Sequence, residues 1–312
     1  MRKFTIQAFN EMFPDEGACL DFLRDTLYPG GVTCRKCGRV TKHHRLSKRR
    51  AYSCQECGTH VYPLAGTIFA KSRTPLKLWL YGMFLMSSTR CGISAKQLQR
   101  ELGVTYKTAW RMFKQLRSLL GQDMTVLGGV VEMDESYFGG KWKWKHESKR
   151  NQTDRKRGRG TSQSRVFGMA QRKQPGQPGR IVVEVVPDMT RASLLPHVKT
   201  RVLPESTVYT DEFAAYDQLG EMGYRHSRIH HAQKVYVAGD VHVQTVEGFW
   251  ALVKRGIGGV YHSVSTKYLQ TYLDEYAFRY NHREDESPMF AIFGQEVPTV
   301  RYGRFGAYHP IG

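Results

Sequence analysis

The sequence lacks any long hydrophobic run. Its longest nearly unbroken apolar stretch, residues 78–86, has nine residues, far fewer than the roughly 20 that a helix needs to cross a bilayer. No apolar segment follows the charges of residues 1–5, so we expect neither a membrane span nor a secretory signal, and a cytoplasmic location. The six cysteines are then not expected to form disulfides, because that compartment is reducing.

Acidic side chains are also scarce, with 28 Asp and Glu against 47 Lys and Arg and a net charge of +19. Residues 31–120 carry 18 basic and 2 acidic side chains, and residues 141–180 carry 13 and 2, whereas residues 121–140 carry four acidic ones alone. Basic blocks of this size are typical of polyanion-binding surfaces. Nucleic acid is the favoured partner, because no amphipathic membrane anchor is evident. For residues 141–180, a solvated loop without a partner is the alternative.

The apolar periodicity, with 12% aromatic residues, excludes a disordered chain. The pattern predicts a helical segment over 5–28 interrupted at Pro14, short strands over 32–70, and helices over 75–120. An α/β region follows. Its expected strands are 126–133, 166–170, 181–186 and 207–210, and its expected helices are 191–203, 213–222, 245–256 and 266–281. Residues 284–312 are predicted to form an irregular tail.

Four of the six cysteines form two Cys-x2-Cys pairs separated by sixteen residues, and a glycine follows each pair. Zinc favours four tetrahedral thiolates, and a glycine allows the tight turn that places two sulfurs on one ion. The quartet Cys34, Cys37, Cys54 and Cys57 therefore predicts a zinc ribbon with a structural zinc ion. Cys19 and Cys91 lie outside it, and we expect both to be small buried residues.

Residues 94–113 resemble a helix-turn-helix, with Ser94 and Thr105 as helix caps and Gly103 at the turn. The second helix is predicted to direct Ala109, Trp110 and Phe113 toward the core. It would present four outward side chains to DNA. These are Tyr106, Lys107, Thr108 and Arg111. The alternative is an ordinary pair of core helices.

Three carboxylates and one lysine form the candidate catalytic group. Asp134 and Asp211 each follow a predicted strand, Glu247 opens a predicted helix, and Lys254 lies two helical turns after Glu247. Hard carboxylate oxygens are what a site for two Mg²⁺ or Mn²⁺ ions needs for phosphoryl transfer. Lys254 would hold a phosphate beside the metals. Taken singly, each acidic residue is better explained as a helix cap or a surface charge, and only their joint placement favours the metal site.

Neighbouring side chains compete for these roles. Glu132 and Glu135 flank Asp134, and we predict that both face away from it; Glu212 is disfavoured in the same way. His242 or Gln244 could serve as a second-sphere ligand before the helix. The three histidines that resemble a metal cluster, His226, His230 and His231, are better interpreted as part of a polar strand.

Several phrases together resemble bacterial insertion-sequence transposases with an amino-terminal zinc ribbon and a DDE domain, a family related to the Merlin transposases. The phrases are YPGGVTCRKCG (28–38), VEMDESYFGGK (131–141), VYTDEF (208–213), HVQTVEGFWALVKR (242–255), YHSVSTK (261–267) and AFRYNHR (277–283). The resemblance implies an RNase H-like core with Asp134 and Asp211 as metal ligands. Gln244 stands where the family often has Asn, a position sometimes counted as the third catalytic residue in place of Glu247.

The resemblance implies four regions. They are an N-terminal helix and zinc ribbon (1–70), a helix-turn-helix-like DNA-binding domain (71–122), an RNase H-like DDE transposase domain (123–284) and a C-terminal tail (285–312). The implied enzyme binds the terminal inverted repeats of an element, cleaves DNA and transfers the strand. Its partners would be double-stranded DNA and further copies of the chain, in the bacterial nucleoid. Two alternatives are an RNase H-like metal nuclease without joining activity and a zinc-ribbon regulator with an inactive catalytic domain.

Overall fold

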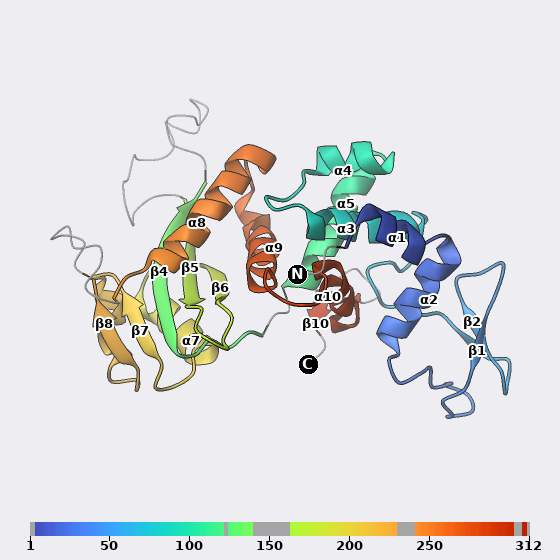
Figure 1. The fold of residues 1–312 in the computed structure, drawn as a ribbon, viewed down its shortest axis with the longest axis horizontal. Coiled ribbons are helices and arrows are strands. Elements are labelled where there is room, and N and C mark those ends of the chain that lie inside the picture. The colour runs from blue at the N-terminus through green and yellow to red at the C-terminus, as the bar shows by residue number, and fades with distance from the viewer. Residues whose placement is uncertain (1–3, 122–123, 140–162, 230–240, 303–307, 311–312) are drawn as a thin grey trace. The chain divides into compact units, whose positions relative to one another are not determined.

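The structure is a computed structural model that describes residues 4–121, 124–139, 163–229, 241–302 and 308–310. The chain forms two compact units (Figure 1). Unit 1 contains residues 1–122 together with 285–312, and unit 2 contains residues 123–284. Much of the second basic block falls in residues 140–162, which are outside the described residues. His230 and His231 are outside them too. No helix among the described residues is long and apolar enough to span a membrane.

Unit 1 begins with two helices, α1 (Ile6–Met12) and α2 (Glu16–Leu27), which confirms the interruption expected at Pro14. Each helix has its own N-cap, because the side chains of Thr5 and Asp15 accept hydrogen bonds from backbone amides one turn later. The cap lowers the pKa of Asp15, mainly through the Ala18 amide. α1 and α2 are therefore two separate helices, not one kinked helix.

The cysteine-rich segment folds into a small antiparallel sheet in the order β1 (His43–Arg45), β2 (Tyr52–Cys54), β3 (His60–Val61). Tyr52 in β2 is fully buried and its hydroxyl donates to Asp21 Oδ1 in α2 over 2.6 Å. Arg45 in β1 reaches the other oxygen of Asp21 at 3.2 Å. Asp21 therefore contacts two strands of the sheet from α2, and Arg24 of the same helix lies 4.7 Å from the Tyr52 ring centroid.

Three further helices follow: α3 (Leu76–Ser88), α4 (Ala95–Leu102) and α5 (Tyr106–Leu120). The side-chain oxygens of Ser94 and Thr105 accept hydrogen bonds from the amides of Gln97 and Thr108, so both predicted caps are confirmed. Gly103 ends α4 with a φ of 63°, a left-handed conformation that glycine adopts without strain. The turn between α4 and α5 is therefore encoded locally.

The region predicted to be an irregular tail, 285–312, contains an α-helix, so that prediction is wrong. Helix α10 (Met289–Gln295) contacts α3 and α2, and the Phe290 ring stacks on Phe4 with the centroids 4.8 Å apart. Phe290 also contacts Phe9 and Phe13 edge to face. Burial of these rings outweighs the local proline and glycine signals. A short helix η7 (Val297–Thr299) and the antiparallel pair β9 (Val300–Tyr302) and β10 (Tyr308–Pro310) complete the described part.

Unit 2 is built on a five-stranded sheet in the order β6-β5-β4-β7-β8. Its strands are β4 (Val130–Phe138), β5 (Ser164–Gln171), β6 (Arg180–Val186), β7 (Thr207–Thr210) and β8 (Arg225–Arg228). The first three strands pair antiparallel, whereas β7 runs parallel to β4 and β8 runs parallel to β7. His226 lies in β8, which confirms the predicted polar strand for that histidine.

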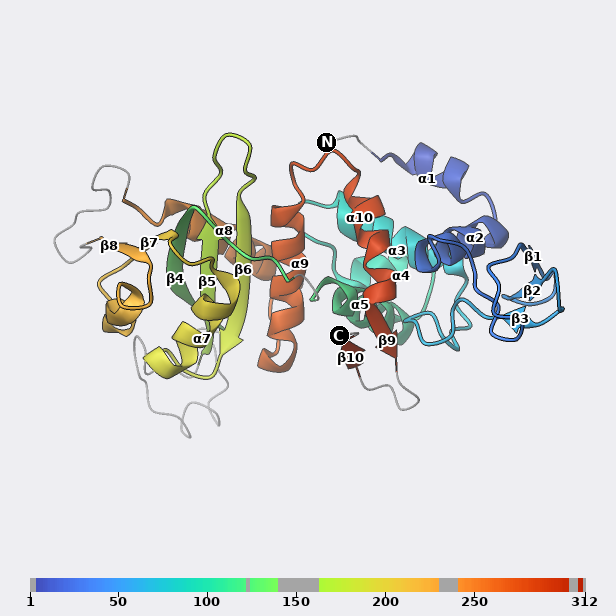
Figure 2. The same cartoon turned by 90° about the horizontal axis from the view of Figure 1, so that it is seen from below.

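Helices cover both faces of this sheet (Figure 2). One face packs on α7 (Arg191–Arg201) and the 3-10 helix η3 (Ala214–Leu219), and the other packs on α8 (Gln244–Gly256) and α9 (Leu269–Asn281). A π-helical turn η5 (Ile257–Tyr261) and a 3-10 turn η6 (Thr266–Tyr268) link α8 to α9. The segment predicted to form a helix over 213–222 contains only the short 3-10 helix η3.

Alternation along β4 assigns its side chains to the two faces. Val131 and Met133 belong to the core on the α7 side, whereas Phe138 belongs to the core on the α8 side. The even-numbered side chains of β4, which include Asp134, therefore face α8. The strand extends to residue 138 rather than ending at 133 as predicted, so Asp134 lies within the strand and not after it.

Candidate functional site

The two cysteine pairs form matching turns in unit 1. The amide of Gly38 donates to the carbonyl of Cys34, and the amide of Gly58 donates to the carbonyl of Cys54, over 2.9 and 3.0 Å. Both glycines have positive φ angles, 70° and 68°. A side chain at either position would be strained, which explains why each pair is followed by glycine.

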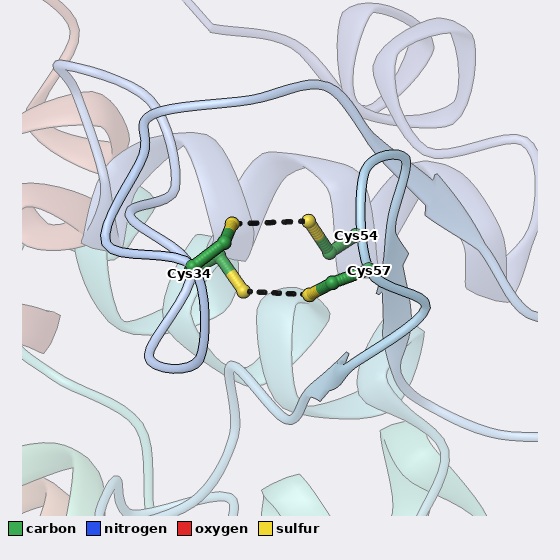
Figure 3. Close-up of side chains that lie close together, drawn as sticks. Cys34, Cys54 and Cys57 are labelled. Carbon is green, nitrogen blue, oxygen red and sulfur yellow. Dashed lines mark hydrogen bonds between the residues drawn. The ribbon is translucent and has the colours of Figure 1, made fainter.

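The four thiols lie together, as predicted (Figure 3). All four sulfurs are within 4.8 Å of one another, with Cys34 and Cys57 at 3.4 Å and Cys37 and Cys54 at 3.9 Å. Four thiolates bound tetrahedrally to zinc at about 2.3 Å would be about 3.8 Å apart. The donor set and its spacing therefore fit a structural zinc ion.

The hydrogen bonds around the quartet act differently on its members: those to the other three cysteines raise the pKa of Cys37, whereas the pKa values of Cys34 and Cys54 are lowered. The Thr41 hydroxyl lies 3.2 Å from Cys54 Sγ, and this contact lowers the pKa of the Cys54 thiol to about 6. Cys19 is buried in unit 1, where desolvation raises its pKa to about 12. Cys91 is exposed, so its predicted burial is wrong; it lies in the segment between α3 and α4.

In unit 2, Asp134 faces helix α8. Its Oδ2 accepts a hydrogen bond of 3.0 Å from the indole Nε1–H of Trp250, in the second turn of α8. Trp250 lies against Gly168, the residue of β5 opposite Asp134, where an added Cβ would meet the indole at 2.4 Å. Only glycine leaves room for the indole at this point, so the Trp250–Asp134 contact depends on Gly168.

Asp211 lies beside Asp134 at the sheet. In the parallel pairing of β4 with β7, Glu132 is opposite Tyr209, and two residues further along each chain come Asp134 and Asp211. Asp211 Oδ1 accepts a 3.0 Å bond from the amide of Phe213, which orients the carboxyl group just after β7. The register and the charge effect of Asp211 on Asp134 therefore place the two aspartates near each other, Asp134 within β4 and Asp211 directly after β7.

Glu247 and Lys254 are both exposed on α8. Glu247 lies in the first turn and adds its negative charge to the surroundings of Asp134. Lys254 Nζ lies 5.9 Å from the ring centroid of Phe138, at the end of β4. The helix thus brings a carboxylate and an ammonium group to the same side of the sheet as Asp134.

We call the group formed by Asp134, Asp211 and Glu247, between β4, β7 and the start of α8, the carboxylate edge. Burial raises the pKa of Asp134 to about 6, and the neighbouring charges of Asp211 and Glu247 act in the same direction. Their oxygens do not converge within 4.8 Å, since the cysteine quartet is the only such group among the described residues. Two further carboxylates therefore act on a buried one, an arrangement that a cation stabilises.

This cluster predicts a pH-dependent stabilisation by divalent cations. The pKa of Asp134 is raised from 3.8 to about 6, so its contribution to stability is fully present below pH about 4 and is lost as the pH rises through about 6, by at most about 3 kcal/mol. Mn²⁺ should offset this loss. We expect Mn²⁺ to raise the Tm of the protein at pH 7.5 but not at pH 4.5, measured by calorimetry.

The matched control is Asp134→Asn, which removes the charge and should abolish most of the Mn²⁺-dependent increase in Tm at pH 7.5. An equal increase in the variant and in the original protein would contradict a cation site at this edge.

Glu132 was predicted to face away from Asp134, and that prediction is wrong. Residues two apart in a strand share a face, and Glu132 is completely buried against α8, where it accepts hydrogen bonds from Thr245 and Val246. Glu135 does lie on the opposite face, where the buried hydroxyl of Tyr216 donates to it. Glu212 is exposed.

The residues before α8 have separate contacts. His242 Nδ1 lies 3.3 Å from Glu132 Oε1, so this side chain is directed to Glu132. Gln244 is exposed at the start of α8. His226 in β8 lies 2.9 Å from the Thr210 hydroxyl through Nε2, and burial lowers its pKa. No histidine among the described residues joins a metal-ligand cluster.

Helix α5 has a buried face and an exposed face. Ala109, Met112 and Phe113 are buried, whereas Trp110 is 36% exposed, so the prediction that Trp110 points to the core is wrong. A helix turns 100° per residue, which places Trp110 beside the buried stripe rather than in it. Three of the four predicted DNA-facing side chains, Tyr106, Lys107 and Arg111, are exposed, and Thr108 is half-buried.

The four-thiol ribbon of unit 1 and the α/β fold of unit 2 both match models of transposase domains. Residues 126–281 match the ISXO2-like transposase domain, and residues 14–60 match the transposase zinc-ribbon domain. The chain belongs to this family of insertion-sequence transposases.

Two relatives agree with this assignment. The chain is 30% identical over 276 residues to the "Uncharacterized protein in transposable element ISH50" of Halobacterium salinarum, a match that covers 86% of this chain and 91% of the relative. It is 31% identical over 108 residues to an "Uncharacterized transposase-like protein" of Haemophilus influenzae, covering 35% of this chain and 86% of the relative.

Proposed function

We propose that residues 123–284 form an RNase H-like DDE domain that cleaves DNA and transfers the cut strand. The strand order supports this: three antiparallel strands are followed by two parallel ones, with helices on both faces. The observation that carries the proposal is the carboxylate edge, where burial and the nearby charges of Asp211 and Glu247 raise the pKa of Asp134. Such an edge is expected where a site holds catalytic divalent cations.

Asp134, Asp211 and Glu247 would hold two Mg²⁺ or Mn²⁺ ions, and their carboxylate oxygens are the ligands that both metals prefer. Ligands of two separate ions need not converge on one point, which is consistent with the spread of these oxygens. When bound, the ions supply charge stabilisation to the reacting phosphate. Lys254 lies beyond Glu247 on the same helix face, where its ammonium group would bind a nonbridging phosphate oxygen.

The proposed reaction has two steps. In the first, a water oxygen forms a bond to the phosphorus at the element end, the bond from phosphorus to the 3′ oxygen breaks, and a free 3′-hydroxyl is left. In the second, this hydroxyl attacks a phosphorus of target DNA and displaces a target 3′ oxygen, which takes up a proton. One phosphodiester is broken and one is formed in the second step, so no external energy source is required.

Incubation with end-sequence DNA, target DNA and Mn²⁺ tests this function. Recombinant joints are the expected product. Cleaved ends without joints would favour the metal nuclease, and DNA binding without metal-dependent cleavage would favour the regulator with an inactive catalytic domain. The three carboxylates present at the edge count against the regulator.

We propose that residues 1–70 and 71–122 recognise the element ends, through the zinc ribbon and through the helix-turn-helix-like pair α4 and α5. The exposed face of α5 supports this, because two aromatic rings, Tyr106 and Trp110, lie on it beside Lys107 and Arg111. Lys96 Nζ lies 4.9 Å from the Tyr106 ring centroid. Cations interleaved with aromatic rings suit phosphate and base contacts.

Replacing both Lys107 and Arg111 by Ala is expected to weaken binding of end DNA by about tenfold or more at 0.15 M salt and to reduce the slope of affinity against salt by about two, because two phosphate contacts are lost. Fluorescence anisotropy across a salt series measures both. Lys199→Ala, an exposed lysine on α7 in unit 2, is the control and should leave the slope unchanged. An unaltered slope in the double variant would favour an ordinary pair of core helices.

Transposition requires the two ends of one element to be held together, so we propose that the protein acts as a homodimer or a higher oligomer. Sedimentation of the protein with and without end DNA tests this. A complex with one copy of the chain that still makes joints would overturn it.

A further inference from the structure

Glu132 is the most enclosed carboxylate of unit 2 for which contacts are described, with an exposed fraction of 0%. It lies in β4, two residues before Asp134, and faces α8. A carboxylate without partners would be strongly disfavoured in such a position. The contacts of Glu132 therefore show what stabilises its carboxylate in this position.

The first contacts are with the start of α8. Glu132 Oε2 accepts hydrogen bonds from the amides of Thr245 and Val246, at 2.7 and 3.1 Å, and Oε1 accepts one from the Thr245 hydroxyl at 2.7 Å. Helix α8 has no capping side chain of its own, since its N-cap residue is Val243. Glu132 therefore caps the helix from a strand more than a hundred residues earlier, and its negative charge is favourable at the positive end of the helix.

The charge of Glu132 is balanced by Arg172, which directly follows β5. Arg172 Nε donates to Glu132 Oε1 over 2.6 Å, and a terminal nitrogen of the same guanidinium donates to the carbonyl of His242 over 2.8 Å. The guanidinium carbon also lies 4.8 Å from the ring centroid of Tyr209, in β7. Arg172 thus contacts the strand that leads to Asp211 as well as the segment that leads into α8.

The Glu132–Arg172 pair therefore connects the three elements that carry the candidate metal ligands. Glu132 belongs to β4 with Asp134, Tyr209 belongs to β7 just before Asp211, and Thr245 belongs to the turn of α8 that carries Glu247. The bond from Trp250 to Asp134 is the only other side-chain hydrogen bond described between α8 and β4. The Trp250–Asp134 bond ties the second turn of α8 to β4, and the bonds to Glu132 tie its first turn to β4.

We propose that Glu132, with Arg172, is a positioning residue that holds Glu247 and its helix in register with Asp134 and Asp211. Glu132 does not bind the metal or the DNA; it acts through α8. The inference rests on the proposed function of the carboxylate edge. Residues that orient metal ligands from behind typically contribute a factor of about 10 to 100 in metal affinity or activity.

Two variants test this in the full-length protein. Glu132→Gln keeps the size of the side chain but loses the charge that pairs with Arg172 and one acceptor oxygen. Thr245→Val removes only the hydroxyl donor and leaves the ion pair in place. We expect Glu132→Gln to raise the half-saturating Mn²⁺ concentration for cleavage by about tenfold and to lower the maximal rate by about 10- to 100-fold, with smaller changes in the same direction for Thr245→Val.

Binding of end DNA, which we assign to unit 1, should be unchanged in both variants. A purely structural role would lower the Tm but leave the half-saturating Mn²⁺ concentration unaltered well below that temperature, and that result would overturn the proposal. If Glu132→Gln does not fold, the Mn²⁺ dependence of Thr245→Val decides.

A second readout does not depend on activity. Hydrogen exchange at the amides of Thr245 and Val246 should accelerate about tenfold or more in Glu132→Gln, and the affinity for Mn²⁺ measured by calorimetry without DNA should fall. If the original protein makes no metal-dependent cut, the proposed function fails, while these two measurements still test the positioning role. Unchanged exchange and unchanged Mn²⁺ affinity would overturn the positioning role alone.

Discussion

Replacing Asp134 by Asn, or Asp211 by Asn, is expected to reduce metal-dependent cleavage of end DNA by about a thousandfold or more. Each substitution removes a hard anionic ligand, and the loss of roughly 4 kcal/mol of transition-state stabilisation corresponds to that factor. Single-turnover cleavage and joining with Mg²⁺ or Mn²⁺ measure the effect. Both products should fall together, because the same edge is proposed to serve both steps.

Folding controls separate this effect from damage to the structure. Asn at position 134 removes a charge that is poorly solvated, as the raised pKa of Asp134 shows, so the Tm of the metal-free variant should not fall at pH 7.5. Glu221→Gln replaces an exposed acidic residue of the same unit and should retain cleavage within about threefold. Cleavage retained in Asp134→Asn or Asp211→Asn would refute the proposed mechanism.

Loss of the quartet is expected to have the largest effect on folding. Cys54→Ser removes one of four thiols that lie within 4.8 Å of one another, and structural zinc supplies on the order of 10 kcal/mol to the folding of small ribbons. We expect the variant to lose the zinc ion, to expose the amides of residues 32–61 to rapid hydrogen exchange, and to lose binding of end DNA. Zinc content after gel filtration and hydrogen exchange measure the outcome.

Cys91→Ser is the matched control, since Cys91 is exposed and outside the quartet. It should keep one zinc ion per chain and normal protection from exchange. Zinc content that is equal in Cys54→Ser and Cys91→Ser would contradict a four-thiolate site. Removal of zinc from the original protein by a chelator should reproduce the Cys54→Ser phenotype and leave the protection of unit 2 unchanged.

Local signals were sufficient for much of unit 1. The spacing of the cysteines predicted the cluster, and the caps Ser94 and Thr105 with Gly103 predicted where α4 and α5 begin and end. Each of these features depends on residues within one turn or one hairpin. Helix α10 was missed because its stability comes from rings on α1 and α2, which no local pattern near Phe290 records.

The sequence predicted which residues form the carboxylate edge, but not the side chains that hold these residues in place. Alternation with period two would have placed Glu132 on the face of Asp134, and this signal was available. Nothing in the sequence places Arg172 beside Tyr209, or Trp250 over Gly168, since these contacts join residues far apart in the chain. The extension of β4 past Asp134 also depended on pairing with β5.

The sequence by itself determined the chemistry of this protein: four thiols spaced for one metal, carboxylates near the ends of predicted strands, and a basic charge concentrated in blocks. Residue type and short spacing are enough for that, because bonding preference is a property of each side chain. Only the tertiary structure decided that the parallel pairing of β4 with β7 brings Asp211 near Asp134, and that a buried Glu132 caps the helix of Glu247. Such relations depend on register and burial between distant segments, which become defined only when the sheet and its helices pack together.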